Sequence, residues 1–389
     1  MKLSVVILNY NVRYFLELCV LSVQKAVQHL DAEIIVVDNN SPDDSCAMIR
    51  ERFPNVVLIE NKENSGFPKG NNIGVAQATG EYICILNPDT VVAEDTFKKV
   101  LAFADTKSEL GIVGVKLIDG KGNFLPESKR GVPTPFVAFT KITGLYRLFP
   151  KMFGKYYASH LTKDETGIVE ILVGAFMVMK REVYLEVGGF DEDCFMYSDD
   201  IDLSYMVLKT GRTNYYYHGT TVIHYKGEST VKDKKYMQRF QQAMNFFYNK
   251  HFKVSVLFSF FMKLGILFFS FVKMFQGKQK PKLVAQDYIL VSHNHELQQR
   301  LQIILNKNVG LIQQLPFSQT FSENRLTEII FDTNFIKFQS IIEVLETNKS
   351  NSVRFRIIPQ IADFLIGSDS SLDRGEVIGI SDLPILRQP

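Results

Sequence analysis

An α/β fold with a largely parallel sheet is the class that this sequence predicts, and three observations lead to it. Short apolar runs alternate with helix-periodic stretches through the first hundred residues. The runs are continuously apolar, which is typical of parallel strands that helices cover on both faces. Polar side chains follow three of the runs, at Asn9, Asp38 and Asp89. Ligands bind beyond the carboxyl ends of the strands in such sheets, so we expect a site at this edge.

The bulk composition is that of a globular protein. The chain of 389 residues is long enough for two or three domains, and its 46% hydrophobic and 22% charged residues are ordinary. A formal net charge of +2 gives no reason to expect a nucleic-acid partner. The few cysteines lack metal-ligand spacing, which predicts reduced thiols in a cytoplasmic compartment. They are Cys19, Cys46, Cys84 and Cys194. The N-terminal apolar run is too short for a signal peptide, so we expect no translocation.

The elements of the first part of the chain follow from apolar runs, helical periodicity and turn residues. Strands are expected at 3–8, 33–38, 56–60 and 82–86, then as a pair within 168–187, and at 213–225. Helices are expected at 13–29, at the end of the 168–187 segment and at about 233–250. The SPDDS segment predicts a helix start with Ser41 as the cap and Pro42 in the first position, because proline suits the first turn.

The segment 252–276 predicts an apolar helix with a narrow polar stripe. The stripe consists of Ser255, Ser259, Lys263, Ser270 and Lys273. The helix is long enough to span a bilayer, but Lys263 lies at its middle, where a charge is costly. We therefore expect a membrane-associated helix lying in the interface, with the basic linker attracted to acidic headgroups. A single membrane span is the alternative.

The character of the chain changes again beyond this helix. Two strand–helix patterns and a further strand predict a small α/β domain, but no glycine-rich turn marks a nucleotide site there. We see no catalytic constellation in this part. The predicted domains are 1–250, 251–282 for the helix and basic linker, and 283–389.

An acidic cluster at the start of a predicted helix is the most informative feature of the sequence. Asp199, Asp200 and Asp202 follow a Gly-Gly turn and an aromatic run. Carboxylates this close repel one another, so such a cluster points to a bound cation or to proton transfer. The alternative is a set of helix N-terminal acids that interact with the helix dipole.

Two further residues predict a divalent cation. Asp89 in the NPDT segment follows a buried strand and offers one acidic ligand; magnesium or manganese suits such oxygen ligation. His224 ends a strand and offers an imidazole as another ligand. A helix cap for Asp89 and a polar strand end for His224 are the alternatives.

A loop rich in glycine and asparagine predicts phosphate binding. It spans 64–74 before a predicted helix, and its candidate donor-binding residues are Asn64, Gly66, Gly70 and Asn71. Glycines let the backbone approach a ligand, and a helix N-terminus favours phosphate. The alternative is a turn that needs positive φ. Asp38 can accept from a base or a ribose hydroxyl, or it can simply end a strand before a cap.

These motifs, in this order, resemble the family-2 glycosyltransferases, specifically the rhamnosyltransferase-like branch of the GT-A fold. The resemblance runs from about residue 2 to 250, and its segments are NYN, VVDNNS, ENSGFPKGNNIG, LNPDT, VGAFMVMKREVYLEVGGFDEDCFMYSDDIDLSYM and HYKGEST. It implies a mixed nucleotide-sugar-binding sheet flanked by helices. Residues 353–380 faintly resemble a Rossmann-like domain found beside polyprenyl-phosphate sugar transferases.

The resemblance also implies roles for single residues. Asn9 and Asp38 would contact the nucleoside of a nucleotide-sugar donor, and Asp89 would hold Mg2+ or Mn2+ on the diphosphate with help from His224. Asp200 would be the general base of an inverting transfer to a hydroxyl. The donor suggested is dTDP-rhamnose, with UDP-sugars open. The chain departs from the family where Asp199 replaces a frequent glutamate.

The acceptor is predicted from a basic segment, 128–163, which carries no acidic residue and is interleaved with aromatic residues. Together with the apolar helix, it suggests a lipid-linked or polysaccharide acceptor at a membrane surface. The expected location is the cytoplasmic face of the cell membrane, peripheral or single-span, in cell-surface glycan synthesis. An ordinary solvated surface over core aromatics is the alternative.

Two other functional classes compete with a transferase. A nucleotidyltransferase would show a glycine-rich, basic phosphate loop near the first strand, and NYNVRYF does not provide one. A non-catalytic sugar-nucleotide scaffold or sensor at the membrane is the second. The combination of Asp89, Asp200 and His224 favours the enzyme.

Overall fold

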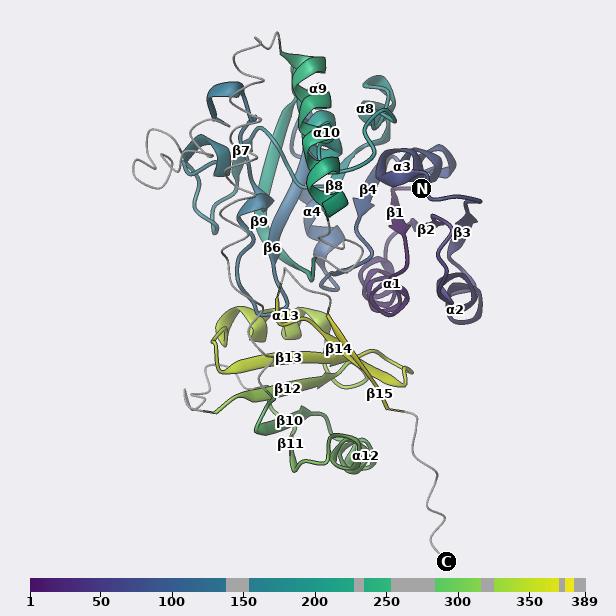
Figure 1. The fold of residues 1–389 in the computed structure, drawn as a ribbon, viewed down its shortest axis with the longest axis vertical. Coiled ribbons are helices and arrows are strands. Elements are labelled where there is room, and N and C mark those ends of the chain that lie inside the picture. The colour runs from purple at the N-terminus through teal and green to yellow at the C-terminus, as the bar shows by residue number, and fades with distance from the viewer. Residues whose placement is uncertain (138–153, 227–233, 253–283, 316–324, 371–374, 381–389) are drawn as a thin grey trace, which may run out of the picture.

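The structure is a computed structural model with two sheets (Figure 1). It describes residues 1–137, 154–226, 234–252, 284–315, 325–370 and 375–380. The first sheet has nine strands in the order β3-β2-β1-β4-β8-β6-β9-β5, with β7 paired to β9. The second has six strands in the order β11-β10-β12-β13-β14-β15. All four cysteines are free.

The first four strands are parallel, as the sequence predicts. They are β1 (Leu3–Asn9), β2 (Ala32–Asp38), β3 (Val57–Glu60) and β4 (Tyr82–Leu86). Helices α1 (Arg13–Val27), α2 (Ser45–Arg52) and α3 (Gly66–Gln77) connect them. Val5 and Val6 of β1 are both fully buried but belong to different apolar clusters, one shared with α1 and one with α3. Both faces of the sheet are therefore covered, which explains the continuously apolar strands.

The remaining strands make the sheet mixed. Strand β8 (Phe176–Lys180) runs antiparallel between β4 and β6 (Leu110–Ile118), and β9 (Thr213–His224) runs parallel to β6. The short strands β5 (Thr90–Val91) and β7 (Gly167–Val169) both pair antiparallel with β9. The other helical elements are α4 (Thr96–Ala104), α8 (Arg181–Glu186), α9 (Asp199–Lys209), α10 (Lys234–His251), and the 3-10 turns Pro126–Ser128 and Gly154–Tyr157.

The second sheet begins with four parallel strands. Its strands are β10 (Asp287–Val291), β11 (Val309–Ile312), β12 (Thr327–Asp332), β13 (Val353–Ile358), β14 (Phe364–Gly367) and β15 (Glu376–Gly379). Its helices are α12 (His295–Leu305) and α13 (Phe338–Thr347). The two predicted strand–helix patterns are confirmed. The sequence did not indicate β11, β14 and β15, each only four residues long.

Helix α13 joins the second sheet to the first (Figure 1). The carboxylate of Glu94 accepts from the backbone N–H groups of Phe338 at 2.8 Å and Gln339 at 2.9 Å, the first two residues of α13. Lys116 of β6 forms an ion pair with Glu346 near the other end of the helix, at 2.7 Å. A carboxylate is favourable at a helix N-terminus and so is a cation at the C-terminal end. Both ends of α13 are therefore held by the first sheet.

One predicted helix start is wrong. Helix α2 begins at Ser45 rather than in the Ser41-Pro42 segment. The Ser41 hydroxyl donates to Asp38 Oδ1 at 2.6 Å instead of capping a helix. The physical reason is that Ser41 bonds to the buried Asp38 carboxylate, a contact that the local sequence does not reveal. The strands predicted as a pair within 168–187 also do not pair with each other, because β7 joins β9 while β8 joins β4 and β6.

The predicted membrane-associated helix lies outside the described residues, together with most of the basic linker. The boundaries near 250 and 283 therefore stay predictions. Within the described ranges, none of the helices is both long and apolar enough to cross a membrane.

We expect the substitution Glu94→Ala to weaken the attachment of α13. It removes a carboxylate that accepts two helix N-terminal N–H groups, a capping interaction worth about 1 kcal/mol. Urea unfolding followed by circular dichroism should show a lower free energy of unfolding by about that amount. The matched control is Glu51→Ala, since Glu51 is exposed and has no bonded partner among the described residues. An equal loss in both variants would contradict the capping role.

Candidate active site

The carboxyl ends of β1 and β2 meet in a buried polar cluster. The side-chain amide of Asn9 donates to Asp38 Oδ1 at 2.7 Å, and Ser41 donates to both Asp38 oxygens through its hydroxyl and its backbone N–H, at 2.6 and 2.8 Å. Asn9 is fully buried and Asp38 is 2% exposed. The Asn9 Oδ1 atom is buried and has no bonded partner within the described part of the chain. The structure thus brings these two predicted donor-binding residues together, with one buried acceptor atom that lacks a partner in the described ranges.

The glycine-rich segment forms the first turns of α3 rather than a free loop. Gly66 has φ of +83°, a conformation that suits glycine, and a Cβ there would lie 2.8 Å from the Phe195 ring. Its N–H donates to Asn64 Oδ1 at 3.1 Å, and its carbonyl accepts from Asn39 at 3.0 Å. Gly66 therefore lets the loop after β3 pass between the end of β2 and the aromatic run before α9.

The other two predicted donor-binding residues sit on the buried side of α3. A Cβ at Gly70 would lie 2.4 Å from Leu8 of β1, so this glycine allows the helix to pack closely on the sheet. The Asn71 amide donates to the carbonyl of Phe67 at 2.9 Å. Its Oδ1 atom is buried without a bonded partner among the described residues. The segment therefore has a packing role for Gly70 and leaves one amide oxygen of Asn71 available.

A second cluster lies where β4 and β9 end. Strand β9 brings His224 opposite Thr90, the residue after Asp89. His224 Nε2 lies 3.4 Å from Asp89 Oδ1 and 3.4 Å from the amide nitrogen of Asn87. Asp89 and His224 are each 5% exposed. Two residues that are far apart in the sequence therefore share one small polar site.

The cluster around Asp89 fits a divalent cation that also binds a ligand. Asn87 Oδ1 and His224 Nδ1 are buried and have no bonded partner in the described ranges. Those ranges hold no set of three or more His, Cys, Asp or Glu side chains suited to a metal. Magnesium usually takes only one or two protein carboxylates and completes its shell with substrate phosphates and water. The donor set of Asp89, His224 and Asn87 therefore suits such a shared site.

Two adjacent carboxylates occupy the first turn of α9. Asp199 and Asp200 are each 8% exposed. Arg130 Nη2 donates to Asp200 Oδ2 at 2.6 Å, and the Gly174 N–H donates to the same oxygen at 3.2 Å. Burial, and then the charge of Asp200, raises the pKa of Asp199 well above its usual range. Tyr197, just before this turn, has φ of +81°, a strained conformation of the kind that occurs at functional sites.

One short loop connects the acidic pair with the Asp89 cluster. Gly174 donates to Asp200, and the carbonyl of the next residue, Ala175, accepts from the N–H of Asn87 at 3.1 Å. A Cβ at Gly174 would lie 3.5 Å from Asp200 Cβ and 3.5 Å from the ring of Phe67 on α3. The candidate base, the candidate metal site and the glycine-rich segment therefore converge on this loop.

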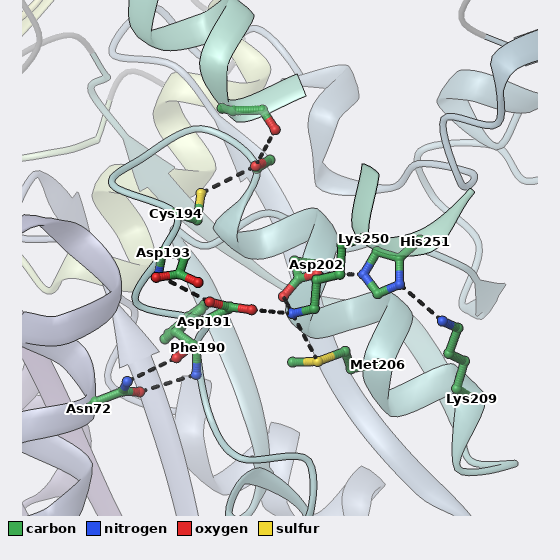
Figure 2. Close-up of polar contacts among 12 residues, drawn as sticks. Asn72, Phe190, Asp191, Asp193, Cys194, Asp202, Met206, Lys209, Lys250 and His251 are labelled. Atoms are coloured by element: carbon green, nitrogen blue, oxygen red, sulfur yellow. Dashed lines mark hydrogen bonds and ion pairs between the residues drawn. The ribbon is translucent and has the colours of Figure 1, made fainter. Parts of the chain in front are cut away.

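The third acid of the predicted cluster has different partners (Figure 2). Asp202 is 1% exposed and accepts from Lys250 at 2.8 Å and His251 Nε2 at 2.5 Å, both on α10. Lys250 also donates to Asp191 at 2.6 Å. Lys209 lies 2.9 Å from the other His251 nitrogen. Asp202 therefore joins α9 to α10, while Asp200 faces the loop at Gly174.

The basic residues at the start of 128–163 are not on a solvated surface. Arg130 is 8% exposed and Lys129 is 5% exposed. Lys129 donates to three backbone carbonyls, those of Tyr157, Ala158 and Leu161, at 3.1, 3.1 and 2.8 Å. Internal acceptors bind both cations, so these two residues do not contribute exposed charge to the segment, and the membrane role of the rest of the segment stays a prediction. Residues 138–153 of the segment lie outside the described part.

Arg130, Asn39, Asn87 and Gly174 are site residues that the sequence did not indicate. Arg130 stood in the sequence among other basic residues, with no local pattern that separates it from Lys129. Asn39 follows the predicted Asp38 and Asn87 lies two residues before the predicted Asp89, so the position after a strand end was the available signal. Gly174 carried no such signal, since its role depends on contacts with distant residues.

Comparisons with known proteins agree with the predicted family. The model of Glycosyl transferase family 2 matches residues 4–188. The chain is 25% identical to the N-acetylglucosaminyl-diphospho-decaprenol L-rhamnosyltransferase of Mycobacterium tuberculosis over 59% of its length and 78% of that protein. It is 29% identical to the poly(ribitol-phosphate) beta-N-acetylglucosaminyltransferase TarS of Staphylococcus aureus over 42% of its length and 29% of that protein.

Similar solved structures include a mannosyltransferase from Pyrobaculum calidifontis in complex with GDP-Man and Mn2+. It shares 20% identity, covers 64% of this chain and 63% of its own, and has a TM-score of 0.45. TarS of S. aureus shares 18% identity, covers 73% of this chain and 46% of its own, and has a TM-score of 0.43.

We expect the substitution Asp199→Asn to stabilise the protein at pH 8. The raised pKa of Asp199 means that its contribution to stability is present below the unfolded value of about 4 and is lost as the pH rises through the folded value. An asparagine cannot ionise, so the variant should gain about 1–2 kcal/mol over wild type at pH 8 and nothing near pH 4. Urea unfolding at both pH values measures the difference. Asp193→Asn, at an exposed carboxylate, is the control; a pH-independent gain would contradict the assignment.

Proposed function

We propose that this chain, which resembles glycosyl transferase family 2 over residues 4–188, transfers a sugar from a nucleotide-sugar donor to a hydroxyl of its acceptor with inversion at the anomeric carbon. The observation that carries the proposal is the Gly174–Ala175 loop, which contacts Asp200 on one side and Asn87 of the Asp89 cluster on the other. The sugar carbon that reacts has to lie between the base and the diphosphate, so the two sites must be neighbours.

In this proposal Asp200 is the general base. It takes the proton from the acceptor hydroxyl as the hydroxyl oxygen forms a bond to the anomeric carbon. The bond from that carbon to the diphosphate oxygen breaks at the same time, and the nucleoside diphosphate leaves from the opposite face. Only Asp200 Oδ2 is bonded to protein groups in the described part of the chain, so Oδ1 is the oxygen that can receive the proton. A positioned base contributes about 10²–10⁴-fold to the rate.

Asp89, His224 and Asn87 would hold Mg2+ or Mn2+ in this proposal. When bound, such a cation neutralises charge on the donor diphosphate and on the leaving group. These side chains would place the cation, and with it the diphosphate, beside the Gly174–Ala175 loop, which Asn87 contacts. Asn9 and Asp38, with the start of α3, would bind the nucleoside on the other side, where the buried Asn9 oxygen has no bonded partner among the described residues.

We propose a lipid-linked or polymeric glycan as the acceptor, with dTDP-rhamnose as the first donor to test and UDP-sugars as the alternative. The names of two relatives support this choice, one an L-rhamnosyltransferase with a diphospho-decaprenol substrate and one a transferase with poly(ribitol-phosphate). In this proposal the protein acts at the cytoplasmic face of the cell membrane, in cell-surface glycan synthesis.

Asp200→Asn should abolish turnover and spare donor binding. The variant keeps the side-chain volume but cannot accept the acceptor proton, so we expect kcat to fall by about 10²–10⁴-fold. Donor affinity, measured by titration calorimetry, should change by no more than about twofold. Asp193→Asn serves as the matched control with unchanged kcat. Loss of donor binding together with turnover would count against Asp200 as the base.

Asp89→Ala should abolish the manganese-dependent part of donor binding. A true donor raises the melting temperature with its concentration, because it binds only the native state. We expect one nucleoside diphosphate and its sugar to produce this rise with Mn2+ in wild type and not in the variant. Asp31→Ala is the control, since Asp31 precedes β2 at the opposite edge of the same sheet.

The same nucleotide-binding measurements, together with an assay for transfer, distinguish the transferase from a non-catalytic protein. Binding of a nucleotide sugar without transfer or donor hydrolysis would favour a non-catalytic scaffold or sensor. The absence of any shift in a folded protein, with every nucleotide tried, would contradict the transferase.

A further inference from the structure

We propose that Arg130 is the positioning residue of Asp200: it holds one carboxylate oxygen and presents the other to the acceptor hydroxyl. This inference rests on the proposed transferase function and adds a residue that the sequence motifs did not indicate. Arg130 does not itself touch the reacting atoms in this proposal. It acts through Asp200.

The contacts of Asp200 are one-sided. Arg130 Nη2 lies 2.6 Å from Oδ2, and the Gly174 N–H lies 3.2 Å from the same atom. No described residue bonds to Oδ1, and the Asp200 side chain keeps 12% of its surface exposed. A carboxylate held by one oxygen has a fixed orientation, while its second oxygen keeps its lone pairs for an incoming O–H group.

Arg130 is itself fixed in place before any substrate binds. Its backbone N–H donates to the carbonyl of Ile171 at 2.9 Å, and its carbonyl accepts from the Ile171 N–H at 2.9 Å. The same Nη2 that meets Asp200 also donates to the carbonyl of Leu172 at 2.9 Å. Arg130 therefore spans from one end of the 171–174 segment to Asp200, and the segment holds both partners of the carboxylate.

In the described part of the chain, the buried site at Asp200 holds two carboxylates but one cation. Asp199 lies beside it on α9, and Arg130 faces it from the chain before the 171–174 segment. Glu127 and Tyr156 also interact electrostatically with the Arg130 guanidinium, but Glu127 forms an ion pair with Lys226. One buried cation therefore serves two buried carboxylates. Without it, a proton would be taken up by the pair more readily, because like charges at this distance favour the protonated form.

A purely structural role explains these contacts less well. A buried ion pair is expensive to desolvate, and an apolar pair of similar volume often stabilises a fold as well. A pair kept only for folding would be expected to use both carboxylate oxygens in a two-pronged contact with the guanidinium. The observed contact uses one.

The test compares Arg130→Gln and Arg130→Lys with wild type in the full chain, with Arg212→Gln as the control. Arg212 pairs with Glu186 at 2.7 Å on the surface and away from this site. We expect R130Q to lower kcat by about 10–100-fold and to move the acidic limb of the kcat/KM profile up by about one pH unit. The KM for the donor should stay within about twofold. R130K should restore the limb and part of kcat, and R212Q should change neither.

A second change checks the electrostatic part. In the double variant R130Q/D199N one negative charge is removed with the positive one, so the acidic limb should return toward that of wild type. A limb that stays displaced would overturn this part of the proposal. An R130Q variant that is folded by circular dichroism and has the wild-type profile would overturn the whole.

If R130Q does not fold, R130K carries the test. It keeps the charge but replaces the planar fork with a single ammonium group. A kcat lower by about fivefold or more, with the acidic limb and donor KM unchanged, supports positioning, whereas an unchanged kcat overturns it. If the proposed function is wrong, wild type shows neither transfer nor donor binding at any pH. The proposed role of Arg130 is then wrong as well.

Discussion

Two neighbouring carboxylates at the start of α9 are almost out of contact with water, and the active face of the molecule is organised around their charge. Burial of a carboxylate is unfavourable without a cation or several hydrogen bonds. Arg130 and the Gly174 N–H meet this need at Asp200, whereas burial and the neighbouring charge raise the pKa of Asp199. The segment that includes Gly174 and binds Arg130 is followed by Ala175, whose carbonyl accepts from the N–H of Asn87. The acidic pair and the cluster at Asp89 are therefore parts of one site.

The sheet topology explains why this segment lies where it does. Strand β8 is antiparallel to β4, with Phe176 opposite Leu86. The residues just before β8 therefore lie beside the carboxyl ends of the parallel strands, the edge at which α/β sheets bind ligands. Strand β9 ends at the same edge, because His224 pairs with Thr90. A purely parallel sheet would have placed the loop before β8 at the opposite edge.

Other contacts keep the helices of this face in register. The Asn72 side chain of α3 bonds to both backbone groups of Phe190, at 2.9 and 3.1 Å, and the adjacent Asp191 binds Lys250 of α10 (Figure 2). Lys250 in turn binds Asp202 of α9. These residues connect the glycine-rich segment to the helix that carries the candidate base. The second sheet attaches through the two ends of α13 and through Phe364, whose ring centroid lies 4.8 Å from that of Tyr14 on α1.

The sequence by itself determined the parallel strands, most helices, the resemblance to a glycosyltransferase family and the candidates Asn9, Asp38, Asp89, Asp200 and His224. Continuous apolar runs and polar strand ends are local patterns, and the motifs follow one another along the chain. Only the tertiary structure separated Asp202 from its two neighbours, because that depends on which side of α9 meets α10. It alone moved the start of α2 away from Ser41, whose hydroxyl binds Asp38. It alone assigned Arg130, since a basic residue shows its partner only when a distant carboxylate, 70 residues along the chain, is folded against it.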